Sequence, residues 1–310
     1  MNLLDFSTRF KDEESCRAYL KEKREAEGVT CKKCGSKEHY WLATLNCWKC
    51  KSCGTWTNLR KGTIMEKSKL PVRTWFMCIH LMTSITKSFS ALEMQKQLGL
   101  TSYESAWYMM QKTRKVMGKR DACYKLKGEL ELDDAYFKIV DVQYDEIGNK
   151  LEKVKVQGRG TDKAKVLVIV ESAANPEATG KYNKKRIMGF VKMIVMDELT
   201  QESINAAVRK HVNSESSIIS DKISTYNKLN EVVENHTATK VEPTEAGVQL
   251  PWVHTVISNA KRLFLGVHHS IGKQFLQNYL DEYCYKLNRR NFKSDLFDRM
   301  IIAGASDTWY

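Results

Sequence analysis

The chain has 310 residues, of which 42% are hydrophobic, and a formal net charge of +13. This length allows two or three domains with buried cores, and the composition excludes a disordered chain. No apolar run approaches the roughly 18 residues of a membrane-spanning helix. The N-terminal stretch MNLLDFSTRFKDEESCRAYL lacks the apolar core of a signal peptide. We therefore expect an intracellular protein without a membrane partner.

Three segments with different patterns follow one another along the chain. Residues 1–62 combine a polar, helix-prone lead with a cysteine-rich stretch, and residues 63–127 are helical and basic. Residues 128–310 alternate between strand and helix patterns. We expect three domains with these boundaries.

The cysteine-rich stretch predicts a zinc ribbon. Five of the nine cysteines lie within residues 31–53, and such clustering in an intracellular chain indicates a metal site rather than disulfides. Cys31 and Cys34 form one C-x2-C-G turn, and Cys50 and Cys53 form a second. Four thiolates suit a structural, tetrahedral Zn²⁺. Cys47 also forms a C-x2-C pair with Cys50, but the glycine after Cys53 favours the 50/53 pair.

The second segment has a charge pattern and a helix pattern that favour nucleic acid as its partner. Residues 60–128 contain 14 lysines or arginines against 4 acids, a balance of +10. Such a basic stretch favours a polyanion. Residues 90–98 predict a helix, 99–101 a turn, and Ser102 caps a second helix running to about Met117.

This order, helix, glycine-containing turn, helix, is that of a helix-turn-helix, whose second helix enters the major groove of DNA. Trp107 and Met110 are expected to face the core. The basic residues expected to contact the DNA backbone are Lys112, Arg114, Lys115, Lys119 and Arg120.

The third segment predicts a metal-dependent catalytic domain. Residues 128–140, 166–172 and 186–199 read as strands, residues 201–212 as a helix, and Asp221 ends a fourth strand. Acids on the first and fourth strands of such a sheet suit an RNase H-like fold that holds two Mg²⁺ ions. The fold class expected is therefore mixed α+β or α/β, with an RNase H-like domain preceded by the zinc ribbon and the helix-turn-helix.

The chain also resembles the IS1595-type transposases, whose catalytic part is the ISXO2-like domain. The resemblance runs from about Val29 to Asn291. Besides the two cysteine turns, the motifs that carry it are KGTIM, LPVRTWF, ELDDAYF, GRGTDK, IISDK, LPWVH, GVHH and YLDEYCYKLNRR. The resemblance implies an RNase H-like fold and Mg²⁺-dependent cleavage and strand transfer of DNA ends.

Carried over to this sequence, the family's two catalytic aspartates are Asp133 and Asp221, 88 residues apart. A glutamate is expected 33–36 residues after the second aspartate, but His254 lies 33 residues after it and Lys261 follows seven residues later. Seven residues are nearly two helical turns, so His254 and Lys261 share a face. Asn259, off that face, remains the alternative third residue.

Two further acids accompany Asp133. Glu131 shares its strand face and can support it, whereas Asp134 points to the opposite face. Asp133, Asp221 and His254 are the expected Mg²⁺ ligands, and Lys261 is expected to hold a phosphate.

These observations favour a DNA transposase acting through a DD(H/N)K site. It would bind double-stranded DNA at element ends and at the target, as a homodimer or larger assembly. The alternative is a non-catalytic or domesticated zinc-ribbon DNA-binding protein.

Overall fold

The structure, a computed structural model, describes residues 1–85, 87–139, 163–178, 185–239, 249–268, 271–292 and 295–306. The chain forms two compact units, one of Met1–Arg120 and Arg289–Tyr310, the other of Asp121–Asn288. Residues 158–162 of the GRGTDK motif and the second histidine of GVHH lie outside the described residues. Within the described ranges, no helix is long and apolar enough to cross a membrane.

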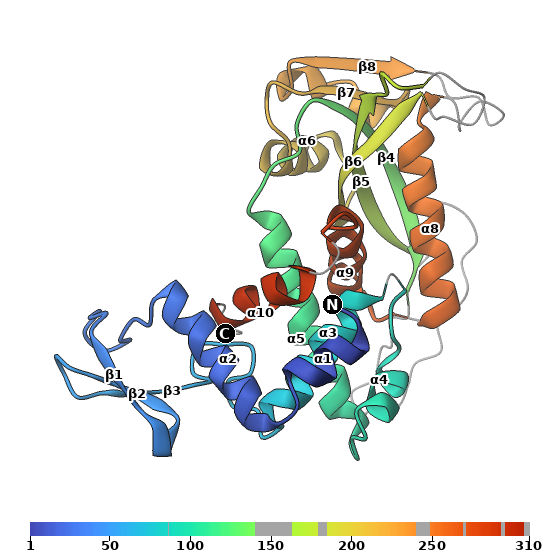
Figure 1. Cartoon of the computed structure of the whole chain (residues 1–310). Helices are drawn as coiled ribbons and strands as arrows, with labels where there is room; N and C mark the ends of the chain where they lie inside the picture. Colours follow the sequence, from blue (N-terminus) through green and yellow to red (C-terminus); the bar gives the residue numbers. More distant parts are fainter. Residues whose placement is uncertain are drawn as a thin grey trace, which may run out of the picture. The chain divides into compact units, whose positions relative to one another are not determined.

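The first unit combines a small sheet with helices (Figure 1). Its antiparallel sheet has the strands β1 (His39–Leu42), β2 (Cys47–Cys50) and β3 (Trp56–Asn58), with the 3-10 turn η1 (Ala43–Leu45) between β1 and β2. Its helices are α1 (Leu3–Arg9), α2 (Glu13–Glu27), α3 (Val72–Ser84), α4 (Ala91–Gln97), α5 (Tyr103–Ala122), whose last two residues belong to the second unit, and α10 (Leu296–Ser306).

An aromatic cluster forms the core of this unit. The rings of Phe10 and Phe76 lie 5.2 Å apart between centroids, and Phe297 of α10 lies 5.4 Å from Phe10. Buried aromatic rings contribute large apolar areas to a core. The core therefore joins helices from both ends of the chain.

Helix α10 packs on α2 and α3, although the sequence grouped residues 289–310 with the catalytic segment. The amide of Ile64 donates to the carbonyl of Gly304 over 3.0 Å. A Cβ on Gly304 would lie 2.9 Å from Ile64 Cδ1, so the close approach favours glycine. The second unit accordingly ends at Asn288.

The second unit is built on a five-stranded sheet with the order β6-β5-β4-β7-β8. The strands are β4 (Glu129–Lys138), β5 (Lys163–Ala174), β6 (Arg186–Met196), β7 (Ser217–Asp221) and β8 (Asn235–Thr239). Strands β4, β5 and β6 are antiparallel, whereas β4, β7 and β8 run parallel. The strands predicted at 166–172 and 186–199 are confirmed as β5 and β6; the short polar edge strand β8 was not predicted.

Helical segments cover both faces of this sheet. They are α6 (Gln201–His211), η2 (Ser224–Tyr226), η3 (Leu229–Glu231), α8 (Pro251–Val267), η4 (Lys273–Phe275) and α9 (Leu276–Asn288). Helices α8 and α9 pack on one face through the valines of β5, and α6, η2 and η3 pack on the other through Leu130, Leu132 and Leu167. Because side chains alternate along a strand, odd-numbered residues of β4 face α8.

Candidate active site

Two aspartates meet at the centre of the second unit's sheet. Strands β4 and β7 are parallel neighbours, with Leu132 opposite Ser220, so the next residues, Asp133 and Asp221, come level. Asp133 shares its face of β4 with Ala135, which packs in the core under α8. The sheet thus brings together two carboxylates that are 88 residues apart in the chain.

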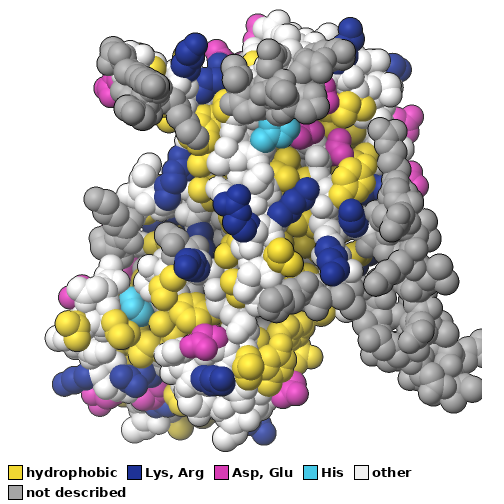
Figure 2. All heavy atoms as spheres, turned by 90° about the vertical axis from the view of Figure 1, so that its right-hand side faces the viewer, with side chains coloured by type: hydrophobic (Ala, Val, Ile, Leu, Met, Phe, Trp, Pro, Cys, Tyr) yellow, Lys and Arg dark blue, Asp and Glu magenta, His cyan; other side chains and the backbone are white. Residues whose placement is uncertain are grey.

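Helix α8 adds His254 and Lys261 to this face. Nδ1 of His254 lies 3.6 Å from Oδ2 of Asp133, and the two side chains are 34% and 16% exposed. Lys261 follows two turns later, with Nζ 5.9 Å from the ring centre of Phe137. Figure 2 looks onto the α8 side of Figure 1, where a histidine lies beside acidic side chains and several lysines or arginines lie near it. His254 and Asp133 are therefore partly accessible to solvent.

The pKa of Asp133 is raised to about 7, mainly by burial and also by the charges of Asp134 and Asp221, against the opposing effects of the Asp134 amide and Lys261. The amide of Asp134 donates to Oδ1 of Asp133 over 2.8 Å. Burial also lowers the pKa of His254, so its imidazole is neutral at pH 7. Near neutral pH, Asp133 therefore exchanges a proton readily and His254 offers a free nitrogen lone pair.

The donor set fits a divalent cation. Mg²⁺ prefers carboxylate oxygens, and two neighbouring half-buried carboxylates are stabilised by a cation between them. Nε2 of His254 is buried and has no hydrogen-bond partner among the described residues. Asp133, Asp221 and His254 do not, however, bring their ligand atoms as close together as the cysteines described below.

The neighbouring candidates lie elsewhere. Asn259 is exposed and sits about 140° around α8 from His254. Asp134 points to the opposite face of the sheet, where Oδ1 accepts a hydrogen bond from the hydroxyl of buried Tyr226 over 2.8 Å. Glu131 faces α8, but Oε2 accepts hydrogen bonds from the backbone of that helix and Oε1 accepts one from the hydroxyl of Ser172.

The cysteine turns of the first unit form the second candidate metal centre. The thiols of Cys31, Cys34, Cys50 and Cys53 lie within 4.8 Å of one another, the only such group of ligands in the described part of the chain. Cys47 lies outside it, as predicted. The hydroxyl and the amide of Thr55 lower the pKa of Cys53 to about 6, which favours the thiolate that binds Zn²⁺.

The two turns repeat one geometry. In the first, the amide of Gly35 donates to the carbonyl of Cys31, and in the second that of Gly54 donates to Cys50, over 2.9 and 3.0 Å. Both glycines have positive φ, 72° and 71°, a conformation that favours glycine. The glycine that follows each cysteine pair is thus required by the turn.

Two family models match the chain, one over each unit's candidate centre. The profile of the ISXO2-like transposase domain matches residues 125–288, which include Asp133, Asp221, His254 and Lys261. The chain belongs to this family. The profile of the transposase zinc-ribbon domain matches residues 11–55, which contain the four clustered cysteines. No curated protein matches the chain.

Solved structures give only a weak likeness. A pre-cleavage Mos1 transpososome aligns with 72% of this chain and 76% of its own at 8% identity and a TM-score of 0.29. A mariner Mos1 paired-end complex with Mn aligns with 72% and 75% at 11% identity and a TM-score of 0.29.

The helix pair of the first unit agrees with the predicted order of helix, turn and helix. Ser90 Oγ accepts from the amide of Glu93 at the start of α4, and Ser102 Oγ accepts from the amide of Ser105 at the start of α5. Gly99 makes the turn with φ of 61°. Helix α5 continues to Ala122, five residues beyond the predicted end.

The predicted DNA-contact residues on α5 divide into two groups. Lys115, Lys119 and Arg120 are exposed. Lys112 is half-buried and donates to the carbonyl of Ile64, and Arg114 is only 1% exposed. Arg114 follows buried Met110 by four positions and precedes buried Met117 by three, so it belongs to the core-facing side of α5. The helical spacing alone predicts this buried position. Arg114 is therefore not a surface contact in this structure.

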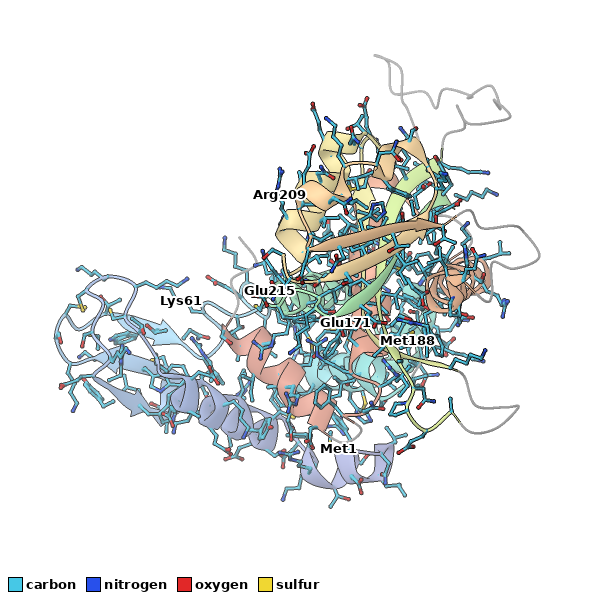
Figure 3. The ribbon with its side chains drawn as sticks, turned by 90° about the horizontal axis from the view of Figure 1, so that it is seen from above. Met1, Lys61, Glu171, Met188, Arg209 and Glu215 are labelled. Carbon is cyan, nitrogen blue, oxygen red and sulfur yellow. The ribbon has the colours of Figure 1, made fainter. Side chains whose placement is uncertain are left out.

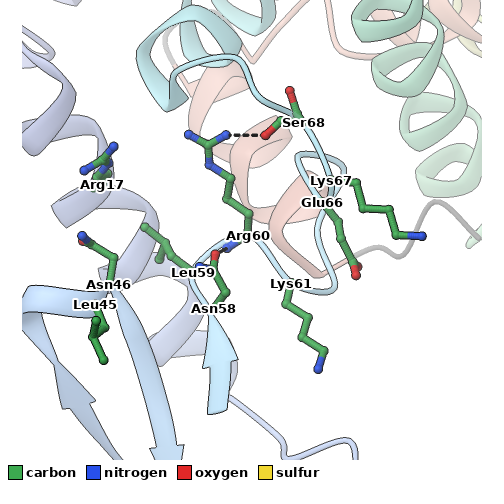
Figure 4. Close-up of a pocket in the computed structure, with 10 residues that line it drawn as sticks. All are labelled: Arg17, Leu45, Asn46, Asn58, Leu59, Arg60, Lys61, Glu66, Lys67 and Ser68. Atoms are coloured by element: carbon green, nitrogen blue, oxygen red, sulfur yellow. Dashed lines mark hydrogen bonds between the residues drawn. The ribbon is translucent and has the colours of Figure 1, made fainter.

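A groove of about 550 Å³ lies beside the ribbon sheet, lined by four basic side chains (Figure 4). Both arginines that line the groove already bind groups of the protein itself. Arg60 donates to the carbonyls of Ser68 and Leu70, and Arg17 pairs with Glu13 at 3.1 Å. The groove is therefore explained by the packing of the loop that follows β3.

Proposed function

We propose that this chain is a DNA transposase that cleaves and joins DNA strands with Mg²⁺ held by Asp133 and Asp221. The observation that carries the proposal is the meeting of the two aspartates on adjacent parallel strands, with His254 3.6 Å from Asp133. Membership of the ISXO2-like transposase family supports the reaction class. An RNase H-like fold is part of the same proposal, supported by the strand order and by helices on both faces.

The residues have distinct tasks in this proposal. Asp133 and Asp221 hold the metal ions, and their carboxylates must be ionised to do so. When bound, Mg²⁺ supplies activation of a water or 3′-hydroxyl and stabilisation of the leaving oxygen. Neutral His254 acts as the third ligand or accepts a proton beside Asp133, and the ammonium of Lys261 binds a phosphate of the scissile strand.

DNA binding is proposed for the first unit. The zinc ribbon and the α4–α5 pair would bind the element ends, with phosphate contacts from Lys115, Lys119 and Arg120. Two ends must be brought together for transfer, so the proposal includes a dimer or larger assembly on double-stranded DNA.

The test is strand cleavage of DNA carrying the sequences that flank the gene at its own locus, with Mg²⁺ or Mn²⁺. Asp133→Asn and Asp221→Asn are expected to lose at least about 1,000-fold in rate, because each removes a carboxylate ligand. Asp134→Asn is the matched control: it neutralises the adjacent residue on the other face and still accepts from Tyr226. Its rate should stay within about threefold of wild type.

The alternative function, a DNA-binding protein without catalysis, predicts a different result. Wild type and both aspartate variants would then behave alike in cleavage while binding the same DNA. That outcome would overturn the enzyme proposal and keep the DNA-binding one.

A further inference from the structure

The buried carboxylate of Glu131 lies between strand β4 and the first turn of helix α8. Glu131 is 1% exposed and stands two residues before Asp133 on the same strand face. Its Oε2 accepts hydrogen bonds from the amides of Trp252 and Val253, both over 2.8 Å. Its Oε1 accepts from the hydroxyl of Ser172 over 2.5 Å.

Helix α8 lacks a cap of its own. Its N-cap residue is Leu250, and no side chain there accepts a hydrogen bond from the first turn. The first amides of any helix need external acceptors, and the positive end of the helix dipole favours an anion. Glu131 therefore supplies from the sheet the cap that the local sequence of α8 omits.

The same carboxylate is joined to the neighbouring strands. Nε of Arg186 on β6 donates to the hydroxyl of Ser172 on β5 over 2.7 Å, and the indole Nε1 of Trp252 donates to the carbonyl of Arg186 over 3.1 Å. A bulge between Val170 and Ser172 interrupts the β5–β6 register here. Figure 3 labels Glu171, in this bulge, and Met188, the partner of Ser172 on β6.

Each oxygen of Glu131 thus has a donor inside the protein, so Glu131 is poorly placed to bind a metal. The helix turn that it holds leads directly into His254, and the strand that carries it leads to Asp133. We propose that Glu131 is a positioning residue, which fixes α8 against β4 and thereby sets His254 beside Asp133. This inference rests on the proposed function only for the catalytic role of Asp133 and His254. The anchoring of α8 by Glu131 does not depend on the proposed function.

Amide hydrogen exchange of the full-length, metal-free protein tests the anchoring. Glu131→Ala removes the acceptor, and the amides of Trp252 and Val253 should exchange about 30-fold faster. Glu131→Gln keeps one carbonyl oxygen for both amides, so the change should be about threefold or less. Glu215→Gln, an exposed glutamate before β7 in the same unit, is the control and should leave these amides unchanged. If Glu131→Ala leaves the exchange of these amides unchanged, the proposal is overturned. If Glu131→Ala does not fold, Glu131→Asp takes its place, because the aspartate side chain is too short to reach the two amides. The folded Glu131→Asp protein should then show the faster exchange.

Mn²⁺ binding, followed by electron paramagnetic resonance, tests whether the anchor acts through His254. Glu131→Ala should weaken binding about tenfold in the wild-type background, as loss of a supporting contact does, and Glu131→Gln should restore most of it. In a His254→Ala background the same change should add less than about twofold. An equal effect in both backgrounds would show a general structural role and overturn the positioning proposal.

The two proposals fail separately. If wild type neither binds Mn²⁺ nor cleaves DNA, the proposed function falls, while the exchange experiment still decides whether Glu131 anchors α8. If wild type does both and Glu131→Ala changes neither, only the positioning role falls.

Discussion

The two candidate metal centres of this transposase family member are built in opposite ways. The cysteine centre takes its four ligands from 23 consecutive residues and brings the thiols within 4.8 Å of one another. The carboxylate centre draws on Asp133, Asp221 and His254, which lie on three elements and span 122 residues of the chain. One centre is formed by two local turns, and the other exists only when the whole sheet has folded.

This difference predicts different roles for the two proposed metals. The ribbon has three short strands and a small core around Trp48, so Zn²⁺ contributes a large part of its stability. The second unit has two buried clusters, one on each face of its sheet, so we expect it to fold without an ion. The metal proposed there would then serve the reaction rather than the fold.

Removal of zinc is expected to have the largest effect. Chelation should unfold residues 31–58, because apparent zinc-binding free energies of about 10 kcal/mol or more are folding free energy in such modules. Hydrogen exchange should show lost protection on β1–β3 and unchanged protection on β5. Cys47→Ser is the control for the ligand assignment and should retain one zinc per chain. If β1–β3 stay protected after zinc removal, the ribbon does not depend on zinc for its stability, and the contrast between the two centres is wrong.

Asp133, in contrast to the zinc ligands, should lower the stability of the metal-free protein when it ionises. Its pKa of about 7 lies above the ordinary 3.8, so the folded protein keeps a proton that the unfolded chain releases, and stability falls as pH rises from about 4 to 7. Asp133→Asn removes this penalty and should stabilise the metal-free protein at pH 8 by at most about 4 kcal/mol. Denaturant unfolding at pH 4 and pH 8 measures it. No gain at pH 8, or an equal gain at both pH values, would count against the buried, ionising carboxylate.

A smaller effect is expected at His254, the proposed third catalytic residue. His254→Ala should lower the cleavage rate about 10- to 100-fold, since it removes a neutral nitrogen beside Asp133. Asn259→Ala, on the exposed side of the same helix, is the matched variant and should stay within about threefold of wild type. The reverse order would make Asn259 the third residue.

The smallest expected effect concerns the phosphate contacts of α5. Lys115→Ala and Lys119→Ala should each weaken DNA binding severalfold and reduce the log–log salt slope by about 1. Arg114→Met keeps the buried volume and should leave that slope unchanged, although it can lower stability. Fluorescence anisotropy at several salt concentrations distinguishes the lysine variants from Arg114→Met. A reduced slope for Arg114→Met would indicate that Arg114 contacts DNA.

The sequence predicted best where a motif is local. The four cysteines, with a glycine after each pair, specify their own turns. The alternation of β4 correctly separated the faces of Asp133 and Asp134. The charge of Arg114 suggests a DNA contact, whereas its spacing from Met110 and Met117 indicates the buried position that the structure shows.

Contacts between distant segments could not be predicted. The partner of Glu131 depends on how α8 docks on the sheet, and no local pattern encodes that docking. Helix α10 likewise joins the first unit through Phe297 and Gly304, far in sequence from the helices it covers. The apolar periodicity predicted the helices and strands, but their partners follow only from the assembled core.

The most direct test of the central claim is metal-directed cleavage of the protein itself. Fe²⁺ can replace Mg²⁺ at oxygen-rich sites, and with ascorbate and peroxide it generates radicals that cut the nearby backbone. Mass spectrometry should find cuts close to Asp133, Asp221 and His254 in one protein, and all three should disappear together in Asp133→Asn. Cuts near only one of these residues, or cuts that persist in Asp133→Asn, would contradict a single metal centre assembled from three distant segments.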